Sequence, residues 1–234
     1  MRENFQRRSF AMSENQIDFG IKAVSYSYEV HPFEPFIEKD TKVLIVGTCP
    51  PHRFCIDSTE TQIARESGSL VEGKKSELFW FYGSSDNNLW KEINVRFDTK
   101  LRTVGEIQDW CVRNRLGFMD LFHTVQRYKG LASDTYISPI KVRSLTQYLL
   151  KYTEIEHIFF TSEWATNIAK KEYLEENFAW LKRESIKTDG VFEFQNGRKD
   201  VNFYHLSSPS PNNTSNTKKG WDFLKSCIEK EVNQ

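Results

Sequence analysis

Four near-continuous apolar runs constrain the fold of this 234-residue chain more than any other feature. They are KVLIVGT (42–48), LGFMDLF (116–122), HIFFTS (157–162) and NFYHLS (202–207). Runs of this kind, rich in β-branched and aromatic residues, are typical of strands that are buried on both faces. Such strands occur in parallel sheets whose two faces are covered by helices.

Helical patterns separate these strands in the sequence. The stretch 103–117 opens with a capping box made by Thr103 and Glu106. The stretch 138–152 places Ser138 at the expected N-cap, with a proline in the first turn. Two further stretches have helical spacing, 163–178 and 217–232. Because strands alternate with helices, we expect an α/β protein, a three-layer α/β/α sandwich with a central, mostly parallel four-stranded sheet.

The remaining segments complete the domain organisation. Residues 191–204 have the pattern of a hairpin that turns at Asn196–Gly197 and feeds the last strand. The polar stretch 56–77 interrupts the alternation, and we interpret it as a mobile loop or short helix near the site. Residues 1–20 have the pattern of a loose leader, so we expect a single domain over residues 21–234.

The composition argues against several classes of protein. No apolar run approaches the roughly 20 residues that cross a bilayer, and the N-terminal stretch lacks the apolar region of a secretory signal. We therefore expect a cytoplasmic protein without a membrane partner. The 32 basic and 32 acidic residues cancel. This balance argues against a protein that coats nucleic acid but is compatible with an enzyme that contacts a few phosphates.

The four cysteines predict neither a disulfide framework nor a metal centre. Cys49, Cys55, Cys111 and Cys227 include no CxxC pair, and a cytoplasmic chain keeps its thiols reduced. A zinc or iron–sulfur site would need at least three ligands from distant segments. We therefore expect no metal and no cofactor.

Three segments carry polar or aromatic groups that suit a binding site. Strand 42–48 runs into GTCPP, where Gly47 allows the backbone N–H groups to approach an anion or the edge of a base. The segment FWFYGSSDNNLWKEI (79–93) holds an aromatic ring, Tyr82, and an amide, Asn87. The last apolar run leads into SSPSPNN, whose hydroxyls and amides suit contact with phosphates. Because ligands bind beyond the carboxyl ends of parallel strands, we expect these segments to meet.

These segments resemble the motifs of the uracil-DNA glycosylase superfamily, most closely its hypoxanthine-DNA glycosylase and mismatch-specific uracil-DNA glycosylase branches. The GTCPP strand end is similar to the first family motif, and FYGSSDNNLW to the aromatic–x4–Asn–x2–Trp segment. LGFMDLFHTVQRYKGLASD is similar to a third stretch, and LSSPSPNN to the motif that grips DNA. The four matches follow the family's order along the chain.

The resemblance implies a role for each matching residue. Asn87 is the catalytic residue, which positions the water and the base, and Tyr82 is the ring that stacks on the flipped base. The base-binding residues are Gly47, Thr48, Cys49, Pro50, Tyr82 and Gly83. The DNA-binding residues are Ser207, Ser208, Pro209, Ser210, Pro211 and Asn212. The resemblance thus implies a monomeric, monofunctional DNA glycosylase of base excision repair that removes hypoxanthine or uracil from DNA containing the damaged base.

An asparagine suits this chemistry, although its amide is not a base near neutral pH. The amide offers two donors and an acceptor, which can orient a water and hold a base edge. When bond breaking runs ahead of attack, the base leaves as an anion that fixed N–H donors stabilise. No lysine is placed as a Schiff-base nucleophile, so we expect no lyase activity.

Several alternatives remain open from the residues alone. The catalytic amide can be Asn88 instead of its neighbour. Asp120 can polarise a water, but we expect it to cap the next segment or to pair with Arg127. His205 lies next to the position where other enzymes of the superfamily have a histidine, and we expect its ring to be packed. A non-catalytic nucleobase-binding protein of the same fold, or a hydrolase of nucleosides or nucleotides, would carry the same residues.

Overall fold

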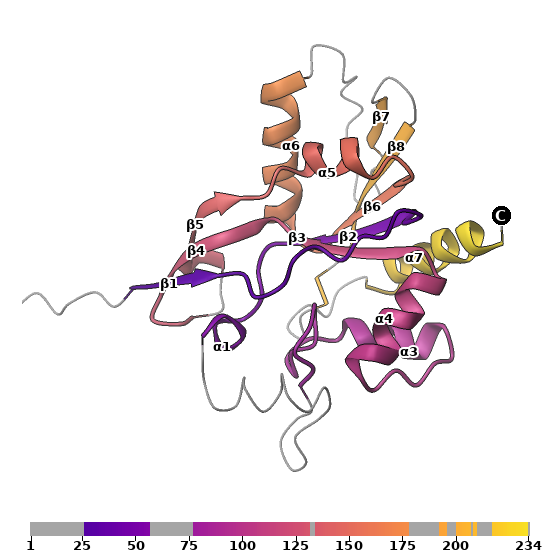
Figure 1. Ribbon diagram of the computed structural model, residues 1–234, viewed down its shortest axis with the longest axis horizontal. Coiled ribbons are helices and arrows are strands. Elements are labelled where there is room, and N and C mark those ends of the chain that lie inside the picture. The colour runs from indigo at the N-terminus through magenta and orange to yellow at the C-terminus, as the bar shows by residue number, and fades with distance from the viewer. Residues whose placement is uncertain are drawn as a thin grey trace, which may run out of the picture.

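The central sheet contains five strands from the described part of the chain, and Figure 1 shows its arrangement. The computed structural model describes residues 26–56, 77–131, 134–177, 192–195, 200–206, 208–209 and 217–233. The strand order is β3 (Leu116–Asp120), β2 (Val43–Gly47), β6 (His157–Phe160), β8 (Asp200–His205) and β7 (Phe192–Gln195). The first four run parallel, whereas β7 pairs antiparallel with β8. The predicted four-stranded parallel sheet is confirmed, and the predicted hairpin supplies the fifth strand.

Helices cover both faces of this sheet (Figure 1). One face carries α5 (Leu145–Lys151) and α6 (Glu163–Asn177), and the other carries α3 (Leu89–Arg96), α4 (Val104–Arg113) and α7 (Thr217–Val232). Successive side chains of β2 pack alternately against the two helical layers. Leu44 and Val46 pack with α5 and α6, whereas Val43 and Ile45 pack with the other three helices. The predicted three-layer sandwich is therefore confirmed.

The capping box at the start of α4 is confirmed, but the predicted end of this helix is wrong. The Thr103 hydroxyl accepts from the Glu106 N–H, and the Glu106 carboxylate accepts from the Thr103 N–H. The helix ends at Arg113, because Gly117 already belongs to β3. Between them Arg115 has a φ of 50°, the left-handed conformation that often follows a helix.

The predicted helix at 138–152 is wrong in its first half. Residues Ile137–Val142 form strand β5, and α5 begins only after Ser144, whose hydroxyl accepts from the Gln147 N–H. Strand β5 lies at the edge of a sheet, where the missing N–H of Pro139 is tolerated. Edge pairing with a neighbouring strand therefore outweighs the apparent N-cap signal at Ser138.

Strand β5 belongs to a second sheet that the sequence analysis did not predict. This antiparallel sheet has the order β1 (Tyr26–Val30), β4 (Phe122–Tyr128), β5. A single residue, Leu121, separates β3 from β4, so the predicted strand 116–122 is divided between two sheets. The short helix η1 (Asp134–Tyr136) precedes β5, and the short helix α1 (His52–Cys55) follows β2. The second sheet thus lies beside the carboxyl ends of β2 and β3.

A buried ion pair ties the second sheet to the loop that follows β2. Arg127 in β4 donates to Glu29 Oε2 in β1 at 2.8 Å and to the Pro50 carbonyl at 3.0 Å. His52 Nδ1 lies 2.6 Å from Glu29 Oε1. The side chains of Arg127 and Glu29 are 1% and 0% exposed. Burial alone would raise the pKa of Glu29, but the hydrogen bonds and the charge of its partners outweigh burial and hold the pKa below its ordinary value.

Some sequence predictions fall outside the described residues. They concern the leader at 1–20, most of the polar stretch 56–77 and the turn at Asn196–Gly197. None of the four cysteines forms a disulfide with another described residue, and Cys111 and Cys227 are buried. Among the helices within the described ranges, none combines the length and apolar character needed to cross a bilayer.

Replacing Arg127 by methionine should destabilise the protein strongly. The change leaves the Glu29 carboxylate buried without its main partner, a loss that costs about 3–5 kcal/mol. The double variant Arg127→Met/Glu29→Leu should regain much of this free energy, since no unpaired charge remains. Denaturant unfolding of both variants measures the two free energies. A single variant within about 0.5 kcal/mol of the wild type would contradict the role of the pair.

Candidate functional site

A pocket of about 730 Å³ opens at the carboxyl ends of the parallel strands. Its lining includes one segment from the end of each strand: Gly47–Pro51 after β2, Asp120 of β3, Thr161–Ser162 after β6 and Ser208–Pro209 after β8. From β2 the chain goes first to β3 on one side and later to β6 on the other. The pocket therefore lies at the switch point of the sheet, where ligands of such folds bind. Its volume falls within the range of about 300–1,000 Å³ that is usual for ligand pockets.

Gly47 lines the pocket, and two polar groups approach it closely. A Cβ at this position would lie 2.3 Å from Asp120 Oδ1 and 2.4 Å from the Tyr82 hydroxyl oxygen. Any other residue would therefore displace one or both groups. Glycine at the end of β2 thus brings a carboxylate and a phenol to the same point.

Tyr82 enters the pocket from the segment that precedes α3. Its hydroxyl lies 3.0 Å from Thr161 Oγ1, which donates to the Val46 carbonyl at 3.4 Å. Burial, together with the charge of Asp120, raises the pKa of the hydroxyl well above its ordinary value, so the group stays protonated. The backbone at Tyr82 has a φ of 56°, which is rare for an aromatic residue. Strain of this kind persists only where the surroundings impose it, and it is concentrated at functional sites.

Asn87 lines the pocket beside the start of α3. Its Oδ1 accepts from the Leu89 N–H at 2.9 Å, which satisfies a donor at the helix N-terminus and identifies the oxygen end of the amide. Within the described residues Nδ2 has no hydrogen-bond partner. The neighbouring Asn88 does not line the pocket, and its Oδ1 accepts from Lys91 Nζ at 3.3 Å. Of the two asparagines, Asn87 therefore lies at the pocket and Asn88 does not.

The loop after β2 brings together four of the predicted base-binding residues. All of them line the pocket: Gly47, Thr48, Cys49 and Pro50. The carbonyls of Gly47 and Thr48 accept from the N–H groups of Leu121 and Phe122 at 3.0 and 2.9 Å. In the part of the chain that the structure describes, the Thr48 N–H donates to no protein atom. This N–H is available to a ligand.

Gly83, also predicted to bind the base, is not among the residues that line the pocket. Its N–H donates to the Trp80 carbonyl, and its carbonyl accepts from the Leu78 N–H. A Cβ at Gly83 would lie 2.0 Å from the Leu78 carbonyl oxygen, so a tight turn requires the glycine. Trp90 is 6% exposed and packs in the core.

Asp120 pairs with His31, so the expected pairing with Arg127 is wrong. Asp120 Oδ2 lies 2.9 Å from His31 Nε2, and both side chains are buried. The Phe33 carbonyl lies 2.8 Å from the other ring nitrogen of His31. Arg127 is directed instead to Glu29. The second carboxylate oxygen of Asp120 approaches Gly47 at the pocket.

Arg53 in α1 is a pocket residue that the sequence analysis missed. Its Nε donates to Glu77 at 2.8 Å, and its Nη2 contacts Glu77, Ser84 and Asp86. These contacts attach the segment that carries Tyr82 to α1. No sequence motif marks this arginine, because its partners lie far along the chain.

Thr161 and Ser162 also line the pocket and were missed. They follow β6 directly, so the rule that ligands bind beyond strand ends could have identified them. Ile137 could not be found in this way, since its strand was predicted as a helix.

The predicted DNA-binding loop is described in part. Ser208 and Pro209 line the pocket, and the Pro209 carbonyl accepts from the Asn88 N–H at 2.9 Å. The other predicted residues lie outside the described ranges: Ser207, Ser210, Pro211 and Asn212. His205 is exposed rather than packed, with Nδ1 at 3.3 Å from Thr166 Oγ1, and it does not line the pocket.

Comparison with known proteins adds a likeness in fold. No protein-family model matches the sequence, and neither does any curated protein. Among solved structures, the chain is similar to the solution NMR structure of a "putative Uracil DNA glycosylase" from Methanosarcina acetivorans. The TM-score is 0.54 at 14% sequence identity, and the match covers 88% of this chain and 99% of that one. The chain therefore shares its α/β/α fold with that protein.

Proposed function

We propose that the protein is a DNA glycosylase that hydrolyses the N-glycosidic bond of a deaminated base, hypoxanthine or uracil, flipped out of DNA. One observation carries the proposal. The pocket gathers Tyr82, Asn87, the loop after β2 and the start of the loop after β8 around one space. These segments are the ones that resemble the glycosylase motifs. The fold shared with the Methanosarcina acetivorans protein supports the same function.

In this proposal Asn87 positions the attacking water. Its amide cannot take a proton near neutral pH, but Oδ1 has a lone pair beyond the one that the Leu89 N–H uses. Because that hydrogen bond holds the amide in place, the water site is preorganised. Asp120 Oδ1 approaches the same pocket and would stabilise the positive charge that develops on the sugar as the bond breaks.

Tyr82 and the loop after β2 would bind the base. The ring of Tyr82 offers stacking worth about 1–3 kcal/mol per base, which offsets part of the cost of unstacking the base from DNA. The contact between its hydroxyl and Thr161 orients the ring before the base enters. The Thr48 N–H would stabilise the anionic charge of the departing base.

The loop that follows β8 would grip the DNA strand. Hydroxyl and backbone groups bind phosphates without adding positive charge, which agrees with a net charge of zero. We accordingly propose a monomeric, monofunctional enzyme of base excision repair in the cytoplasm. Its partner would be DNA containing a damaged base. Its relatives would be the hypoxanthine-DNA glycosylase and mismatch-specific uracil-DNA glycosylase branches of the uracil-DNA glycosylase superfamily.

Oligonucleotides with one deoxyuridine or one deoxyinosine test the proposed function. Incubation with the protein and then with hot alkali should break the strand at that position, because alkali cleaves abasic sites. Single-stranded and duplex forms should both be assayed, with the undamaged sequence as the control. The absence of an abasic product from every damaged substrate would overturn the proposal.

The same materials distinguish two other functions. Binding of the damaged strand without an abasic product would indicate a non-catalytic base-binding protein. Release of base from free inosine or deoxyinosine, without cleavage in DNA, would indicate a nucleoside hydrolase.

Asn87→Ala should lower the single-turnover rate of base release by about 10²–10³-fold, as expected when one positioned polar group leaves an active site. Asn88→Ala is the matched control, because Asn88 does not line the pocket, and it should stay within a few-fold of the wild type. Asn87→Ser keeps an oxygen that can accept the Leu89 N–H, so it should fold normally. The serine oxygen lies one bond closer to the backbone than Oδ1 and no longer holds the water in place, so this variant should still lose activity. Full activity in Asn87→Ser would remove Asn87 from the mechanism.

Tyr82→Ala should weaken the binding of damaged DNA by about 5–150-fold, which corresponds to one lost stacking contact. Tyr82→Phe keeps the ring and should bind within a few-fold of the parent protein. Equilibrium binding is best measured in the Asn87→Ser background, in which the base is not released. If Tyr82→Phe loses as much affinity as Tyr82→Ala, the hydroxyl contact to Thr161 matters and stacking does not.

A further inference from the structure

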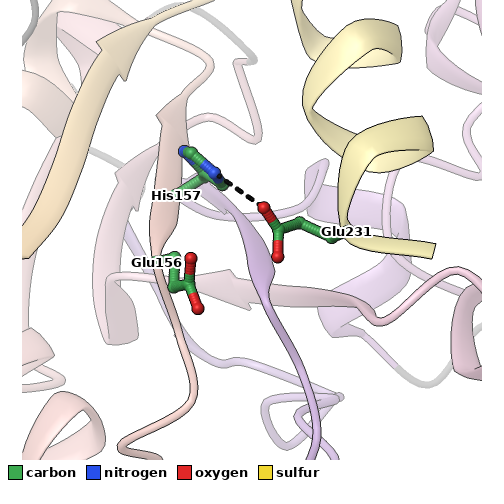
Figure 2. Close-up of side chains that lie close together, drawn as sticks. All are labelled: Glu156, His157 and Glu231. Carbon is green, nitrogen blue, oxygen red and sulfur yellow. Dashed lines mark hydrogen bonds and ion pairs between the residues drawn. The ribbon is translucent and has the colours of Figure 1, made fainter. Parts of the chain in front are cut away.

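Three side chains with metal-binding chemistry gather at the opposite end of the central sheet from the pocket (Figure 2). His157 is the first residue of β6, Glu156 precedes it, and Glu231 lies near the end of α7. One ligand atom from each residue lies within 4.8 Å of the other two. The pocket lies at the carboxyl end of β6, so the two sites are separate.

The carboxylate of Glu231 is the observation that points to a ligand. Its side chain is 1% exposed, and Oε2 has no hydrogen-bond partner among the described residues. Oε1 lies 3.4 Å from His157 Nε2 and 3.7 Å from Lys230 Nζ, which is long for hydrogen bonds to a charged group. Figure 2 shows the carboxylate pointing from α7 toward His157 and Glu156. A buried carboxylate with so few partners is unfavourable unless it binds a cation or a proton.

His157 is held in the orientation that a metal ligand requires. Its Nδ1 lies 3.2 Å from the Tyr204 hydroxyl, and the two rings stack with centroids 5.8 Å apart. A hydrogen bond at one ring nitrogen is the usual way in which proteins orient a metal-binding histidine. The other nitrogen, Nε2, is the one that faces Glu231.

We propose that Glu156, His157 and Glu231 bind a zinc ion. Zinc binds imidazole nitrogen and carboxylate oxygen at about 2.0–2.2 Å, and in a tetrahedron of such bonds two ligand atoms lie about 3.3–3.5 Å apart. The separation of 3.4 Å between Glu231 Oε1 and His157 Nε2 matches this edge. An ion bound by both carboxylate oxygens of Glu231 would also give the buried Oε2 a partner. Three protein ligands leave the fourth position to a water.

Two neighbouring cations contact the cluster, and neither pairs with Glu231 Oε2. Lys42 Nζ lies 2.8 Å from Glu156 Oε1 and 2.9 Å from a carboxylate oxygen of Glu154. Lys42 thus bridges Glu154 and Glu156. Arg115 donates to the backbone carbonyl of Glu231 at 3.1 Å. None of these described cations reaches Glu231 Oε2.

The bound ion would join the end of α7 to the amino end of β6. Its role is structural and does not depend on the proposed glycosylase activity. From the spacing of the cysteines we expected no metal. Glu231 lies far along the chain from the other two ligands, and no motif connects them.

Zinc binding by the full chain tests the proposal. After EDTA treatment and its removal, ZnCl2 at about 100 times its Kd should raise the midpoint of thermal unfolding by about 5–10 °C. Titration calorimetry should give one ion per chain. Glu231→Gln has nearly the same shape and should abolish the shift, with zinc affinity reduced by about 10–100-fold or more. Glu154→Gln, which alters a carboxylate outside the cluster, should respond to zinc like the wild type.

A second readout keeps the test independent of folding defects. Co²⁺ in place of zinc should give the intense visible absorption of a four-coordinate ion in the wild type and in Glu154→Gln, but not in Glu231→Gln. An equal zinc response in the wild type and Glu231→Gln would overturn the proposal, since other residues would then bind the metal. A wild type that binds no zinc would overturn it as well.

Discussion

Strand β2 must be buried on both faces and must still end at an open pocket. Residues Val43–Val46 are each 0% exposed. Their side chains pack alternately against the helices on the two faces of the sheet, and the strand lies inside the sheet between β3 and β6. At Gly47 the side chain is absent, so Asp120 and Tyr82 can approach one point. The chain then turns away from the sheet, and the buried Arg127 holds that turn through the Pro50 carbonyl.

The sequence predicts the central sheet well because each buried strand carries its own signal. A run such as Val43–Val46 needs no partner to be recognised as a strand buried on both faces. The second sheet lacks such a signal. Strand β5 buries only Ile137, so its pattern shows no periodicity, and the Ser138–Pro139 pair resembles the start of a helix. Which strands pair with β4 depends on contacts between segments that are distant in sequence.

The candidate site was likewise predictable from the sequence only in part. The loop after β2 and the residues after β8 could be placed from topology alone, because parallel strands end at one edge of the sheet. Topology alone could not distinguish Asn87 from Asn88, because the two residues are neighbours in the sequence and only the folded structure shows which of them faces the pocket. The partner of Asp120 was also out of reach, because His31 precedes β2 and belongs to no motif. Position relative to a strand is predictable, whereas pairing across the chain requires the structure.

Part of the polar lining of the pocket comes from a segment outside the central sheet. Tyr82, Ser84, Asp86 and Asn87 precede α3, and this segment is attached through Arg53, through the bond from Trp90 to the Phe81 carbonyl and through Asn88. The strands of the parallel sheet do not pair with it. Ser84, Asp86 and Asn87 line the pocket and are exposed or half-buried, so substitutions there should alter the ligand that the pocket accepts more than they alter the pairing of the strands.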